Sequence, residues 1–178
     1  MSEITINPAK TCCFTGHRPP VFPDHKGESY WKLSGYLEKE LRSLIHERGY
    51  DTFIVGMAPG FDCMAGMMAT VMKQDFPPFR PHGENIHVIC ALPYDGFLLK
   101  KNCVYAEEQR YIMERADEVV YVCPKPHRGS YQLRNRWMID HSSRLIAYFS
   151  GISGGTQNTI RYAEKKNLPI TNLFGVCK

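Results

Sequence analysis

The chain has 178 residues, of which 43% are hydrophobic and 22% are charged, a composition typical of a single globular domain over residues 1–178. No apolar run reaches the roughly 20 residues that span a membrane, and the first residues lack a signal-peptide layout, so we expect a cytoplasmic protein. The net charge of +4 suits a modest anion such as a nucleotide and argues against a dedicated nucleic-acid binder.

Strand and helix signals alternate along the chain. Short apolar runs rich in β-branched residues predict strands, and leucines at helical spacing with glycine stops predict helices. In chain order we expect a strand at 11–15, a helix at about 30–48, a strand at 52–55, a helix at about 62–75, a strand at 86–92, a helix at about 101–116, a strand at 118–123, a helix at about 130–141, a strand at 144–149, a helix at 154–167 and an edge strand at 169–173.

This alternation predicts an α/β fold in which a mostly parallel sheet is covered by helices on both faces. Right-handed crossovers then give a Rossmann-like, doubly wound arrangement. The proline-rich stretch at 76–85 is too short to be a domain boundary. In the helix at 130–141, we expect Leu133, Trp137, Met138 and His141 on one face, and Arg134 also falls in that stripe. Arg136 points away from it.

Seven cysteines are an odd number, and none forms a Cys-x-x-Cys pair. Buried free thiols in a reducing compartment fit this pattern better than disulfides. The seven histidines form no cluster with metal-ligand spacing, so we expect no metal site.

The strand-to-helix turns of a parallel sheet meet at its carboxyl edge, where ligands bind. Four of the predicted turns contain unusual glycine, proline and polar residues. We expect them to face one crevice, and they cover residues 15–19, 56–62, 92–96 and 150–156.

The turn at Gly154, Gly155 and Thr156 is the strongest candidate for a phosphate site. Two glycines let backbone approach an anion closely, and the start of the following helix favours negative charge. The alternative is a tight loop in which Thr156 caps the helix.

Two further turns supply polar candidates. Arg18 follows Gly16 and His17 after the first strand, and a guanidinium there can bind phosphate in a bidentate manner. Asp62 either caps its helix or accepts hydrogen bonds from a ribose or a base. Its turn, which holds Gly56 and Gly60, is neither a Gly-x-Gly-x-x-Gly motif nor a Walker A motif.

Asn135 and Arg136 have two interpretations. They can form a solvated polar face of their helix, or Asn135 can contact a base or sugar while Arg136 supports a phosphate. Residues 151–155 match the Gly-x-Ser-x-Gly pattern of serine hydrolases, but no histidine follows Ser153, so serine hydrolysis is not supported.

The ordered set of motifs resembles the YpsA-like family of the SLOG superfamily, which also holds the DNA-processing protein DprA and the Lonely Guy phosphoribohydrolases. The resemblance covers about residues 10–174, and its motifs are Thr15-Gly16-His17-Arg18-Pro19, Gly56-Met57-Ala58-x-Gly60-x-Asp62, Arg134-Asn135-Arg136-Trp137-Met138 and Gly154-Gly155-Thr156.

This resemblance implies a Rossmann-like domain that binds a nucleotide-derived ligand, such as ADP-ribose or NAD, and it implies no particular reaction. It is compatible with a homodimer. The ligand-binding residues that it carries over are Gly16, His17, Arg18, Gly56, Gly60, Asp62, Asn135, Arg136, Gly154, Gly155 and Thr156.

One departure separates this chain from the Lonely Guy pattern. The position of that pattern's catalytic glutamate is Arg161 here, and a guanidinium cannot replace a carboxylate in that chemistry. Our leading hypothesis is therefore a binding or sensing protein for a nucleotide-derived ligand. The alternatives are an enzyme that hydrolyses an N-glycosidic or phosphate bond of such a ligand with Asp62 and His17, and a protein that binds single-stranded DNA.

Overall fold

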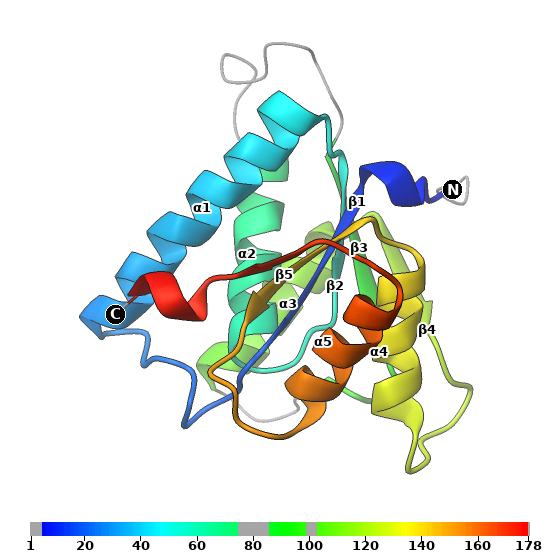
Figure 1. Ribbon diagram of the computed structural model, residues 1–178. Helices are drawn as coiled ribbons and strands as arrows, with labels where there is room; N and C mark the ends of the chain where they lie inside the picture. The colour runs from blue at the N-terminus through cyan, green and yellow to red at the C-terminus, as the bar shows by residue number, and fades with distance from the viewer. Residues whose placement is uncertain (1–4, 75–85, 99–102, 178) are drawn as a thin grey trace.

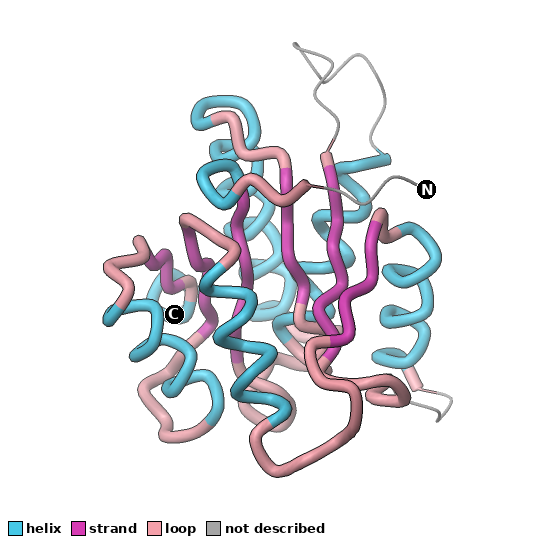
Figure 2. Tube along the Cα trace, turned by 90° about the vertical axis from the view of Figure 1, so that its right-hand side faces the viewer, coloured by secondary structure: helices cyan, strands magenta, loops and turns pink. Residues whose placement is uncertain are grey.

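The computed structural model describes residues 5–74, 86–98 and 103–177, and these form an α/β fold around a six-stranded, all-parallel sheet (Figures 1 and 2). The strands are β1 (Thr11–Gly16), β2 (Thr52–Val55), β3 (His87–Leu92), β4 (Glu118–Tyr121), β5 (Arg144–Tyr148) and β6 (Ile170–Asn172). The helices are α1 (Glu28–Arg48), α2 (Phe61–Gln74), α3 (Val104–Arg115), α4 (Ser130–Asp140) and α5 (Gly155–Lys165).

Helices cover both faces of the sheet (Figure 1). One face packs against the leucines of α1, such as Leu37 and Leu41, and against α2 and Ile112 of α3. The other face packs against Met138 of α4 and Ala163 of α5. Strands such as β2 are buried over their whole length because both of their faces are covered.

In the strand order β4-β3-β2-β1-β5-β6, the direction in which successive strands are added to the sheet reverses at β1. This strand pairs with β2 on one side and with β5 on the other. The chain after β1 and the chain after β5 leave the sheet toward opposite faces. A crevice therefore opens beyond the carboxyl ends of these two strands, as expected at such a switch point.

The predicted Rossmann-like class is confirmed, and the elements agree to within a few residues. Several ends differ by two residues: β4 stops at Tyr121 rather than at residue 123, and α5 stops at Lys165 rather than at residue 167. The predicted connection at 76–85 and the start of the helix at 101 lie outside the described residues.

The inward face predicted for α4 is wrong in one respect. Leu133 is 44% exposed, whereas Arg134 is only 2% exposed and lies among the ends of the strands. The α4 sequence has no clear apolar stripe, so tertiary contacts of Arg134 decide how the helix is turned.

The cysteines in the described part of the chain, Cys177 aside, are free, and all of them except Cys103 are buried. No described helix combines the length and the hydropathy that a bilayer crossing requires.

Candidate functional site

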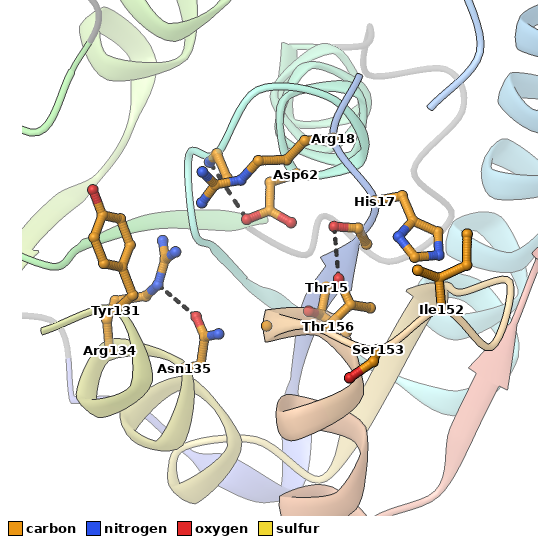
Figure 3. A pocket seen from close by; sticks show the side chains of 14 residues that line it. Thr15, His17, Arg18, Asp62, Tyr131, Arg134, Asn135, Ile152, Ser153 and Thr156 are labelled. Carbon is orange, nitrogen blue, oxygen red and sulfur yellow. Dashed lines mark hydrogen bonds between the residues drawn. The ribbon is translucent and has the colours of Figure 1, made fainter. Parts of the chain in front are cut away.

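A cleft of about 430 Å³ lies at the switch point, a size that suits a small-molecule ligand (Figure 3). It is bounded by the end of β1, the first turn of α2, the first turns of α4 and the loop that leads into α5. Its lining residues are Thr15, Gly16, His17, Arg18, Ala58, Asp62, Tyr131, Arg134, Asn135, Ile152, Ser153, Gly154, Gly155 and Thr156.

The start of α5 forms one wall of the cleft. Gly154 precedes the helix with a φ of 156° and a ψ of −161°, a conformation that is open essentially only to glycine. No described side chain caps this end of the helix, and its first residues, Gly154, Gly155 and Thr156, line the cleft. The helix start therefore offers donors and positive potential to an anion.

Thr156 does not cap α5, which corrects one of the two interpretations drawn from the sequence. Its hydroxyl donates instead to the backbone oxygen of Gly16, 3.0 Å away (Figure 3). This bond ties the start of α5 to the end of β1, so it fixes the distance between two walls of the cleft. Gly16 has no room for a side chain, because a Cβ there would lie 2.5 Å from the Cβ of Phe61.

His17 closes the end of the cleft nearest β5. Its Nε2 accepts a hydrogen bond from the backbone N–H of Ser150 at 2.9 Å, and the Ser150 hydroxyl lies 2.8 Å from the same nitrogen. Burial also lowers the pKa of His17, which keeps the ring neutral and able to accept. The ring therefore joins the turns after β1 and β5, and its accepting nitrogen is engaged.

Arg134 forms the floor on the other side of the cleft. It donates from Nη1 to the backbone oxygens of Gly56 and Ala91, the latter at 3.2 Å, and from Nε to Asn135 Oδ1 at 2.8 Å. The two carbonyls belong to residues at the ends of β2 and β3, where the strands leave backbone oxygens without sheet partners. The guanidinium thus binds three elements together.

Asp62 is the acidic group of the cleft and is 7% exposed. Its Oδ2 lies 3.4 Å from the backbone N–H of Ala58. Burial raises the pKa of Asp62 above its usual value, and the positive charges of Arg134 and Arg18 oppose this rise without cancelling it. A carboxyl group of this kind can exchange a proton closer to neutral pH than an exposed aspartate.

Asn135 and Arg18 complete the polar lining. The Asn135 amide nitrogen donates to Thr159 Oγ1 at 2.8 Å while its oxygen accepts from Arg134, so its side chain positions Arg134 against α5. Arg18 is exposed at the mouth of the cleft, and its guanidinium carbon lies 5.8 Å from the centre of the Tyr131 ring.

The structure brings most of the predicted residues to this cleft. Gly56 and Gly60 pack against lining residues of the cleft. A Cβ on Gly56 would lie 2.6 Å from both Arg134 Nη1 and Asp62 Oδ2. Gly60 adopts a φ of 99° and packs against the backbone of His17. Arg136 is the exception, because it is exposed and lines a neighbouring groove between α4 and α5 that shares only Asn135 with the cleft lining. The prediction that Arg136 supports a phosphate in the cleft is therefore not supported.

Sequence reasoning missed Arg134 and Tyr131. The spacing of the sequence places Arg134 within an apolar stripe of its helix and assigns it no individual role. A signal did exist, since an arginine in a buried stripe must have partners, and the free carbonyls at the carboxyl edge of the sheet supply them. Among the described residues, no group of three or more His, Cys, Asp or Glu side chains is arranged to hold a metal ion.

Comparison with known proteins gives a family match over almost the whole chain. Residues 12–173 match the model of the YspA SLOG family. The chain is also 30% identical over 159 residues to the uncharacterized SPbeta prophage-derived protein YoqJ of Bacillus subtilis (strain 168), a match that covers 80% of this chain and 86% of YoqJ.

Two solved structures share the fold at low identity. DNA processing protein A from Helicobacter pylori, described with a single-stranded DNA binding mode, superposes with a TM-score of 0.58 at 19% identity and covers 92% of this chain. DNA processing protein A (DprA) from Streptococcus pneumoniae gives a TM-score of 0.59 at 15% identity over 90% of this chain. The chain spans 64% and 48% of those two proteins, respectively.

Proposed function

The chain belongs to the YspA SLOG family, and from this premise we propose that its switch-point cleft binds a nucleotide-derived ligand of the ADP-ribose or NAD type. In this proposal the phosphate lies against the start of α5, at Gly154, Gly155 and Thr156. The sugar extends toward Asp62, whose carboxyl group accepts hydrogen bonds from ribose hydroxyls.

The observation that carries the proposal is the uncapped start of α5, which lines the cleft together with two arginines. Arg18 and Arg134 outweigh the single acidic group of the lining, Asp62, and burial favours the neutral form of that acid. An anion entering this cleft meets backbone donors and net positive charge, while a cation would meet repulsion.

Isothermal titration calorimetry with ADP-ribose, NAD, AMP and ribose 5-phosphate tests the proposal. A ligand present at 100 times its Kd should add about 2.7 kcal/mol to the free energy of unfolding, which a thermal shift assay would register. Failure of all four compounds to bind at millimolar concentration would refute the proposal.

The variant Arg18→Met examines the electrostatic part of the proposal. Loss of this charge should weaken phosphate-containing ligands by about 1 kcal/mol, roughly fivefold, and the loss should shrink at high salt. Arg48→Met, at the far end of α1, removes an exposed arginine away from the cleft and serves as the matched control. Equal effects of the two substitutions would mean that only the overall charge matters.

A second candidate function is hydrolysis of an N-glycosidic or phosphate bond in the same ligand. The raised pKa of Asp62 on the cleft wall favours it, because a buried carboxyl group can act as a general acid or base. His17 supports this function less well, since its Nε2 is engaged by Ser150. Product analysis after long incubation with ADP-ribose, repeated with Asp62→Asn, tests this function. If the variant hydrolyses the ligand as fast as the wild type, Asp62 takes no part in the chemistry.

Single-stranded DNA binding is a third candidate, suggested by the description of the Helicobacter pylori protein with the same fold. The groove between α4 and α5 supports it, because Arg136, Arg161 and Lys165 line that groove. A gel shift with an oligothymidylate at two salt concentrations is the test. Phosphate contacts would make the affinity fall steeply as salt rises, and no shift at low salt would remove this candidate.

A further inference from the structure

Three aromatic rings meet at the edge of the cleft opposite α5. Tyr94 and Phe97 come from the loop after β3, and Tyr131 comes from the first turn of α4. The Tyr131 ring lies edge-to-face with Phe97 at 5.8 Å and with Tyr94 at 6.1 Å, and the two tyrosine hydroxyls are 3.1 Å apart. These contacts fix the orientation of Tyr131.

Tyr131 is nevertheless 40% exposed, and it lines the cleft. In Figure 3 the ring rises from α4 on the side of the cleft away from Ser153 and Thr156. An exposed aromatic ring that is already held in place can bind a flat partner with little loss of conformational entropy.

Arg18 leaves a gap over this ring. Its guanidinium carbon lies 5.8 Å from the ring centre, which exceeds the 3.5–4.0 Å of a stacked contact. Two stacked contacts need about 7 Å, so an outward movement of about 1–2 Å by the exposed Arg18 side chain would admit one flat ring between them. Guanidinium groups and tyrosine rings both stack on aromatic faces.

The cleft therefore has two chemically different ends: an anion site at α5 and an aromatic platform at Tyr131. A nucleotide has the same two ends, a phosphate and a planar base. We propose that Tyr131 is the base-binding residue of the cleft and that the base of a nucleotide stacks between Tyr131 and Arg18. This inference rests on the proposed function, and it identifies the aromatic base as a required part of the ligand.

The test compares AMP with ribose 5-phosphate, which lacks the base and keeps the sugar phosphate. In the wild-type protein, calorimetry should show AMP binding roughly five- to 150-fold more tightly, the range expected for stacking of one base. Tyr131→Ala should remove most of this advantage and leave the affinity for ribose 5-phosphate within about twofold. Tyr131→Phe keeps the ring and should keep the preference for AMP.

Two further variants guard against loss of structure. Leu133→Ala shortens an exposed side chain of the same helix outside the cleft lining, and it should change neither affinity. Tyr131→Leu retains an apolar side chain against Phe97 but has no aromatic face, so it should behave like Tyr131→Ala.

The outcomes separate the two proposals. If AMP and ribose 5-phosphate bind the wild-type protein equally, or if Tyr131→Ala weakens both to the same degree, the base platform is wrong while the phosphate site stands. If neither compound binds, the base platform as proposed is wrong, and if ADP-ribose and NAD also fail to bind, the proposed function fails with it.

Discussion

Arg134 and Arg136 stand two residues apart on α4, yet they serve two different regions of the molecule. Arg134 is buried in the cleft, where it makes hydrogen bonds to two strand ends and to Asn135. Arg136 is exposed in the outer groove, which has a volume of about 340 Å³, and its guanidinium carbon lies 5.4 Å from the ring centre of Tyr162.

The polar groups of the cleft hydrogen-bond one another, whereas the three basic side chains of the groove are exposed. In the cleft each polar group holds another in place: Thr156 holds Gly16, His17 holds Ser150, and Asn135 holds Arg134. In the groove Arg136, Arg161 and Lys165 share only their charge. The difference teaches that charge in a sequence indicates attraction for anions, while only a fixed network gives selectivity.

The largest expected effect comes from Arg134→Met. This change removes the buried charge that most opposes the rise in the pKa of Asp62, and it strips a donor from the Gly56 and Ala91 carbonyls. We expect the free energy of unfolding, measured by urea denaturation, to fall by about 3–5 kcal/mol. A loss below about 1 kcal/mol would mean that the network contributes little and that the contrast with the groove is unfounded.

Gly56→Ala should disturb the same hydrogen-bond network around Arg134 by steric overlap. The new Cβ would lie 2.6 Å from both Arg134 Nη1 and Asp62 Oδ2, and overpacking of this kind costs about 1–3 kcal/mol. Gly155→Ala is the matched control, because a Cβ there meets nothing within 4 Å. Thermal unfolding should show a lower Tm for the first variant only, and equal Tm values would contradict the packing argument.

Asp62→Asn should stabilise the protein at neutral pH. Because the pKa of Asp62 is raised by burial, the folded state holds its proton more tightly than the unfolded state, whose pKa lies near 3.8. Its contribution to stability is complete below pH 3.8 and is lost as the pH rises through the raised pKa. Urea denaturation across this window should show a smaller decline for the variant than for the wild type.

Asp95→Asn removes an exposed carboxylate from the loop after β3 and is the control for that experiment. Curves for the wild type and for Asp62→Asn that run parallel across the whole pH range would show that burial does not destabilise the Asp62 carboxylate.

The smallest effect belongs to Arg136→Met. We expect a change in the free energy of unfolding within about 0.5 kcal/mol and no change in the affinity for AMP, because Arg136 is exposed and lies outside the cleft lining. A tenfold loss of AMP affinity would show that the groove and the cleft act as one site, and the distinction between these two regions would then be wrong.

Much of the site could be predicted from turn chemistry. Gly16, Arg18, Asp62 and Gly155 lie at or just after the end of a strand or in the first turn of a helix, and any parallel sheet brings such residues to one edge. The interpretation of individual polar groups could not be predicted in the same way. Thr156 matched a capping pattern locally, but its hydroxyl bonds to Gly16, 140 residues away in the chain.

The amino-acid sequence by itself determined the order of strands and helices and the positions of the turns, because hydrophobic spacing and glycine or proline stops act over a few residues. The tertiary structure alone decided which face of α4 turns inward. That choice rests on bonds from Arg134 to Gly56 and Ala91, which lie 78 and 43 residues away and become neighbours only when the sheet has formed. A buried guanidinium must find acceptors, and the free strand carbonyls outweigh the helix's weak apolar pattern.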